Sequence, residues 1–127
     1  MVLTAENYYS QEANKEYMSV SQFKAFAGTD GKVACEAAAM AELNGEWAMK
    51  KTTPLLVGSY VDSYFEGSLD QFKKENPEIF TQTGELKAPY KQAEQIITRI
   101  ERDPFFMQCM SGQKQVIMTG DLFGAKW

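Results

Sequence analysis

Residues 53–67 read TPLLVGSYVDSYFEG, and this stretch decides the fold class. Thr53 and Pro54 are typical of the cap and first position of a helix, and Gly67 is typical of the residue just beyond a helix end. Between them lie two series of apolar residues spaced four apart, Leu56/Tyr60/Tyr64 and Val57/Val61/Phe65. Because residues four apart share one face of a helix, the stretch predicts a helix with a wide apolar face.

Similar signals on both sides predict more short helices. Ser19 and Gln22 have the spacing of a capping box, and so do Ser68 and Gln71. We expect helices at Val20–Ala27, at about Val33–Leu43, from Ser68 to before Pro77, at about Ala88–Arg102, and after Asp103-Pro104. In the first of these the inward residues are expected to be Val20, Phe23 and Phe26.

The pattern changes only near the end of the sequence. Residues 115–119 and 122–127 are interpreted as two strands, and Gly120-Asp121 between them is typical of a two-residue turn. The sequence therefore predicts an α+β fold of about five to six short helices with a small C-terminal antiparallel hairpin, in a single domain spanning residues 1–127. An isolated hairpin is marginally stable, so Leu122, Phe123 and Trp127 are interpreted as an unpaired edge that binds a partner or a second copy of the chain.

Composition excludes several functional classes. The 127 residues include no histidine, which excludes histidine-based nucleophiles and general bases. Cys35 and Cys109 are too far apart for a zinc motif and too few for a disulfide scaffold. The net charge of −4 is unlike that of a simple nucleic-acid coat protein. No apolar run is long enough for a membrane span, so we expect a cytoplasmic protein without membrane contact.

Two sets of residues are candidates for binding. Asp62 and Glu66 are four apart on the helix that follows Thr53, where they could hold a hard cation or simply face water. Ser19, Ser21 and Lys24 surround the start of another helix, where free N–H groups bind phosphate, although helix capping alone accounts for Ser19. Two matches to the nuclease triplet D/E-x-K, at residues 30–32 and 85–87, lie in expected turns and are interpreted as chance.

Several strings, taken in order, carry a family resemblance. They are residues 3–9, residues 18–26 (MSVSQFKAF), residues 35–40 (CEAAAM), residues 56–62 (LVGSYVD), residues 103–107 (DPFFM) and the expected hairpin at 115–127. Together they resemble the N-terminal half of phage-type PD-(D/E)XK exonucleases, the RecE or exodeoxyribonuclease VIII-like group, over essentially the whole sequence.

This resemblance implies a fold and a chemistry. Members degrade duplex DNA with Mg²⁺ or Mn²⁺ bound on a mixed sheet flanked by helices. Their G-x-x-x-H helix matches Gly58 to Asp62, so aspartate replaces the histidine, and Asp62 is expected to bind metal only together with a C-terminal half. The family's catalytic Asp and D/E-x-K would follow Trp127. Cys35 lacks the three partners that bind an iron–sulfur cluster in some relatives. We therefore expect no catalytic residues and no cofactor in the sequence as given.

Three functions are consistent with these observations. The first is a non-catalytic, exonuclease-like protein related to DNA processing, encoded by a phage or prophage, which binds DNA weakly. The second is a phage inhibitor that binds a host nuclease or a CRISPR effector, since an acidic protein suits a basic nucleic-acid channel. The third is an interaction subunit that completes its sheet with strands from a partner.

Overall fold

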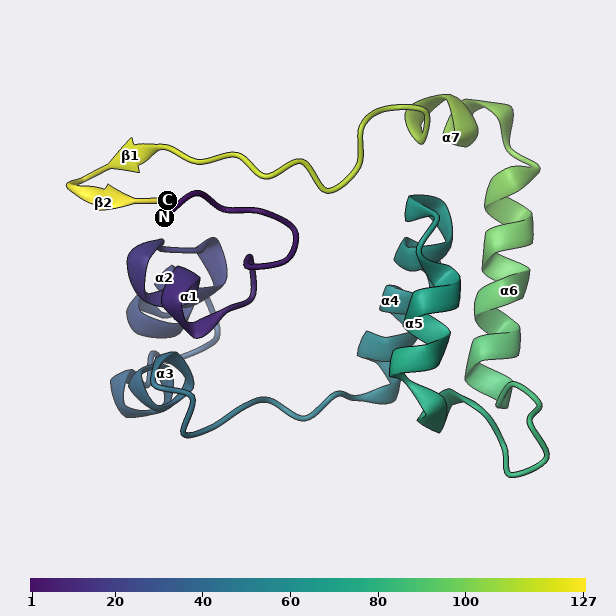
Figure 1. Cartoon of the computed structure of the whole chain (residues 1–127), viewed down its shortest axis with the longest axis horizontal. Coiled ribbons are helices and arrows are strands. Elements are labelled where there is room, and N and C mark those ends of the chain that lie inside the picture. Colours follow the sequence, from purple (N-terminus) through teal and green to yellow (C-terminus); the bar gives the residue numbers. More distant parts are fainter. The chain divides into compact units, whose positions relative to one another are not determined.

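The chain is mainly helical, with one small hairpin near its C-terminus (Figure 1). The computed structural model describes all 127 residues. Its elements are α1 (Gln11–Glu16), α2 (Val20–Ala27), α3 (Glu36–Leu43), α4 (Thr53–Glu66), α5 (Leu69–Glu75), the 3₁₀ helix η1 (Pro77–Ile79), α6 (Ala88–Glu101), α7 (Pro104–Cys109), β1 (Asp121–Leu122) and β2 (Ala125–Lys126). The α+β, mainly helical class is confirmed, with α1 and η1 in addition to the expected helices.

The chain divides into two compact units, which are described separately. The central unit contains residues 50–115, with α4 to α7. The terminal unit contains residues 1–49 and 116–127, which bring α1 to α3 together with the hairpin. The expectation of a single domain stays a prediction.

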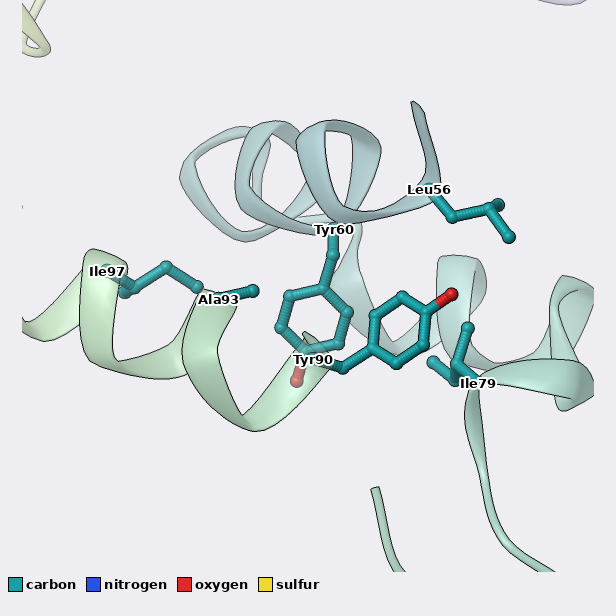
Figure 2. Close-up of a cluster of buried hydrophobic side chains, with 6 residues drawn as sticks. All are labelled: Leu56, Tyr60, Ile79, Tyr90, Ala93 and Ile97. Carbon is teal, nitrogen blue, oxygen red and sulfur yellow. The ribbon is translucent and has the colours of Figure 1, made fainter. Parts of the chain in front are cut away.

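The central unit has a continuous apolar core between α4 and α6 (Figure 2). Tyr60 is fully buried, and its ring lies 6.1 Å from that of Tyr90 and 6.0 Å from that of Phe72. The buried members of this core are Leu56, Tyr60, Ile79, Tyr90, Ala93 and Ile97. The face of α4 expected from the four-residue spacing is therefore the buried face, with Val57, Val61 and Phe65 packed beside it.

The segment between α5 and α6 closes one end of this core. The buried Asn76 side chain donates to the Phe72 carbonyl at 2.8 Å and accepts from Lys51 Nζ at 3.0 Å. Ile79 is fully buried, and its carbonyl accepts from the backbone N–H of Lys87 at 3.0 Å. Both polar groups of the Asn76 amide thus have partners, which offsets the cost of burying them.

The helix boundaries agree with the sequence in some places and differ in others. The capping box of Ser19 and Gln22 is confirmed, and α2 spans the expected residues. Gly67 ends α4 with φ of 83°. The cap of α4 is Thr52 rather than Thr53, and α3 begins at Glu36 rather than near Val33. These shifts of one to three residues are ordinary for helix ends.

The second predicted capping box is wrong. The Ser68 side chain makes no capping bond to α5. Its hydroxyl instead lies 3.5 Å from the carbonyl oxygen of Ser63 and 3.4 Å from Oε2 of Glu66, both at the end of α4. Because Gly67 is the only residue between α4 and Ser68, this hydroxyl is used to close the preceding helix.

The terminal unit buries little apolar surface. Its buried residues are Ala13 in α1 and Ala39 in α3. Val20 is 60% exposed and Phe23 is 49% exposed, so the prediction that both point inward is wrong, while Phe26 is half-buried. The helices α1 to α3 have six to eight residues each, and helices this short cannot cover a wide apolar face on one another.

The hairpin forms, but its predicted register is wrong. Asp121 pairs with Lys126 and Leu122 with Ala125, so the turn is Phe123-Gly124 rather than Gly120-Asp121. Both turn residues have positive φ, 53° and 76°, as a two-residue turn matched to the strand twist requires. Gly120 and Trp127 exchange two backbone hydrogen bonds of 2.8 and 2.7 Å, which extends the pairing by one residue on each side. Residues 115–119 are not a strand.

Candidate functional site

The two acidic residues of α4 do not form a metal site by themselves. Asp62 and Glu66 are exposed one turn apart, and no group of three Asp, Glu, Cys or His side chains is placed to hold a metal ion. Nothing lies within 4 Å of the position where a side chain would begin at Gly58, one turn before Asp62. A magnesium site needs more oxygen ligands than two carboxylates on an open face provide, so these residues alone do not fit the metal that the resemblance implies.

The predicted phosphate site at the start of α2 is only partly assembled. Ser19 Oγ accepts from the backbone N–H of Gln22 at 3.2 Å and lies 2.9 Å from Ser21 Oγ. Lys24 lies in the last turn of the helix, away from its N-terminus. The structure therefore brings the two serines together, uses Ser19 for capping, and does not bring Lys24 to the same end.

The predicted partner edge is divided between free and paired residues. Phe123 is 94% exposed at the turn, and Leu122 is half exposed beside it. Trp127 is half-buried, because its ring packs 5.6 Å from that of Phe23 and its Nε1 donates to the Leu122 carbonyl at 3.1 Å. The outer side of β2 is also occupied, since the Lys126 carbonyl accepts from the N–H of Met18 at 2.7 Å.

A small charged cluster connects the hairpin to α1. Glu16 accepts from the N-terminal ammonium group at 2.9 Å and from Lys126 Nζ at 2.6 Å. These hydrogen bonds lower the pKa of Glu16 and raise that of Lys126. The Lys126 ammonium also lies 5.6 Å from the centre of the Tyr17 ring. Both cations of the cluster are bound to the one Glu16 carboxylate, so we interpret it as a structural contact.

Two tyrosines of α4 donate to carboxylates of α6. The Tyr60 hydroxyl donates to Glu94 at 2.9 Å, and the Tyr64 hydroxyl donates to Glu101. Burial, followed by the bond to Glu94, raises the pKa of Tyr60 far above its ordinary range. The bond to Glu101 is the main cause of a raised pKa at Tyr64. Both phenols thus act as hydrogen-bond donors that connect α4 to two acids of α6.

The sequence reasoning missed a polar groove along the outer face of α6. Its lining residues are Gln95, Thr98, Arg99, Arg102, Asp103 and Pro104, and its volume is about 660 Å³. Arg99 and Arg102 are the only arginines in the chain. The spacing of three residues between them is a signal that could have been found, because it places both on one side of a helix.

The charges of this groove are distributed unevenly. Neither arginine lies within 4 Å of a carboxylate oxygen, since the chain's ion pairs involve only Glu16, Glu85 and their partners. Asp103 also lines the groove, but its Oδ1 accepts from the backbone N–H groups of Phe105 and Phe106 at 3.0 Å each. Two unpaired guanidinium groups thus stand beside one carboxylate that caps α7.

Comparison with known proteins places this fold in a family. Residues 19–127 match the family model of a PDDEXK-like domain of unknown function (DUF3799). The chain belongs to this PDDEXK-like family. A crystal structure of a protein from Eubacterium rectale, called "Putative exonuclease", is 76% identical and superposes with a TM-score of 0.96. The resemblance to PD-(D/E)XK exonucleases is therefore confirmed.

The extent of these matches is unequal. The alignment with the Eubacterium rectale protein covers 100% of this chain and 48% of that protein, so the chain spans about half of its length. A search of curated proteins found no significant match. No helix in the structure combines the length and apolar character needed to cross a bilayer. The cytoplasmic location and the phage or prophage origin stay predictions.

Proposed function

We propose that this chain forms the helical part of a DNA-processing exonuclease of the PD-(D/E)XK type and does not cleave DNA by itself. The observation that carries the proposal is the 76% identity, over the whole chain, to 48% of the Eubacterium rectale protein called "Putative exonuclease". Metal-dependent hydrolysis of a phosphodiester needs carboxylates that hold the ion and a group that positions water. Asp62 and Glu66 are the two acidic residues of α4, and both are exposed.

A nuclease assay tests this proposal. The chain is incubated with end-labelled linear duplex DNA and Mg²⁺ or Mn²⁺, first alone and then with the remaining part of the Eubacterium rectale protein. We expect no product from the chain alone and metal-dependent degradation from the mixture. Degradation by the chain alone, lost in Asp62→Ala and kept in the control Asp70→Ala, would contradict the non-catalytic part. An inactive mixture of two associated pieces would contradict the exonuclease part.

The hairpin turn favours a second candidate function, inhibition of a host nuclease or CRISPR effector by protein binding. Phe123 is almost fully exposed at the turn, beside the half-exposed Leu122, and exposed aromatic side chains are common anchors in protein interfaces. Size-exclusion chromatography with a purified nuclease or effector tests this candidate. A complex that Phe123→Ser abolishes would support it, and failure of the unchanged chain to co-elute with the enzyme would count against it.

A further inference from the structure

The groove on the outer face of α6 has the chemistry of a phosphate-binding surface. We propose that Arg99 and Arg102 bind the sugar-phosphate backbone of duplex DNA, an assignment that rests on the proposed function in naming DNA as the ligand. The guanidinium group presents several donors in a planar fork that matches two phosphate oxygens at once. No carboxylate oxygen lies within 4 Å of either guanidinium group, so their donors are not used in an ion pair within the chain.

The two arginines have no ion pair although the chain has more acidic than basic residues. The chain carries 17 acidic and 13 basic residues, so a guanidinium group has more than enough internal partners. The nearby acids of α6 are instead committed elsewhere, Glu94 to Tyr60 and Glu101 to Tyr64. Each of these hydrogen bonds directs one carboxylate oxygen toward α4, and neither carboxylate lies within 4 Å of an arginine.

The geometry of α6 fits a backbone contact. Its opposite face carries the buried Tyr90, Ala93 and Ile97, so the core fixes the rotation of the helix. Arg99 and Arg102 are separated by about 4.5 Å along the helix axis, and their long side chains can reach neighbouring phosphates of one strand. Gln95 lines the same groove and supplies a neutral amide donor next to the charges, whereas the Thr98 hydroxyl donates to the Glu94 carbonyl.

A neighbouring acidic groove indicates at which end of the α6 surface DNA would bind. It shares Gln95 and Thr98 with the arginine groove and has a volume of about 590 Å³. Its other lining residues include Glu85 and Glu94, and its one lysine, Lys91, lies 3.7 Å from Glu85. Because this end is acidic and self-paired, we expect the DNA backbone to contact the arginine end and to pass away from Glu94.

The test is DNA binding by the full chain without metal. The probe is a fluorescein-labelled 20-base-pair duplex in EDTA, with anisotropy measured between 25 and 200 mM KCl. We expect Arg99→Gln/Arg102→Gln to weaken binding about tenfold or more at low salt. We also expect the negative slope of the logarithm of the binding constant against the logarithm of salt concentration to become shallower by about 1.8, as the loss of two phosphate contacts requires. Arg99→Lys/Arg102→Lys keeps the charge and should keep most of the slope.

The matched control is Lys74→Gln/Lys114→Gln, which removes two charges from exposed positions of the same unit. If this control weakens binding as much as the arginine variant does, binding follows net charge and the proposal is wrong. Failure of the wild-type chain to bind at 25 mM KCl would also overturn it. Since EDTA prevents metal-dependent cleavage, these outcomes are independent of the nuclease assay. Arginine-dependent binding can be found in a chain that has no exonuclease role, and an exonuclease role can be found without binding at these arginines.

Discussion

The central and terminal units are stabilised in different ways. In the central unit, six buried apolar residues from α4, η1 and α6 form one cluster. In the terminal unit only two alanines are buried, and segments far apart in sequence are connected by polar contacts at Glu16, Met18 and Lys126. Exposed polar contacts contribute much less than a buried aromatic core. We therefore expect helices of similar appearance in the sequence to belong to regions of unequal stability.

The difference affects function because the candidate surfaces are distributed between the units. The arginine groove is on α6, which the central core holds in place. The hairpin turn and the serines of α2 are in the terminal unit. A site on a rigid helix keeps its geometry better than one on a lightly packed segment. The comparison thus favours α6 as the preformed binding surface.

The largest effect is expected from Tyr60→Ala in the central core. Removing a fully buried aromatic side chain creates a cavity and costs about 3–5 kcal/mol. Urea unfolding followed by circular dichroism measures this loss. The control Tyr9→Ala changes an 85% exposed tyrosine and should cost less than about 0.5 kcal/mol. Equal losses of unfolding free energy in the two variants would mean that the core around Tyr60 does not stabilise the central unit.

A smaller, stabilising effect is expected from Phe123→Asn in the hairpin. Phe123 has φ of 53°, which is unfavourable for an aromatic residue and favourable for asparagine before glycine. The change should stabilise the hairpin by about 1 kcal/mol, seen as slower hydrogen exchange at the amides of Gly120 and Trp127. Phe105→Asn, at another exposed phenylalanine, serves as the control. Faster exchange in Phe123→Asn would contradict the observed register.

Gly58→Ala sharpens the description of α4. Glycine inside a helix is less favourable than alanine by about 0.8–1 kcal/mol, and no atom lies within 4 Å of the position of the new methyl group. We therefore expect the variant to raise the free energy of unfolding by up to about that amount in the same urea experiment. A destabilised variant would show that the exposed face of α4 is closely covered in solution.

The smallest effect concerns pH and the terminal unit. Because the pKa of Glu16 is lowered in the folded state, its contribution to stability is present above its ordinary pKa of 4.5 and is lost as pH falls through the lowered value. We expect the amide resonance of Met18, which donates to Lys126, to shift between pH 5 and pH 2. In Glu16→Gln this shift should disappear, and a titration identical to that of the wild type would show that another group is responsible.

Local signals in the sequence predicted much of the fold. The capping box at Ser19, the apolar spacing along α4 and the amphipathic pattern of α6 each depend on near neighbours, and the structure contains all three. The prediction of the hairpin register was wrong because Gly120-Asp121 has the composition of a turn. The observed turn instead places Phe123 in a conformation that aromatic residues seldom adopt. Although Gly120 has a high preference for turns, it pairs with Trp127 in the structure and lies outside the turn.

The candidate site was less predictable than the fold. Sequence spacing placed Asp62 and Glu66 on one face of α4 but could not show what lies opposite that face. The arginine groove depends on where the carboxylates of α6 are directed, and this is decided by Tyr60 and Tyr64 of another helix. Such contacts join residues more than thirty positions apart, so no local pattern records them.

Residue-resolved hydrogen exchange of the full chain tests the central claim most directly, namely that α6 is held by the one well-packed core of the molecule. Amides within α4 and α6 should exchange only through global unfolding. Amides of Met18, Gly120 and Trp127, which hold the terminal unit together, should exchange with a clearly smaller free energy of opening. The same opening free energy in both units, or faster exchange in α6 than in the hairpin, would contradict the account.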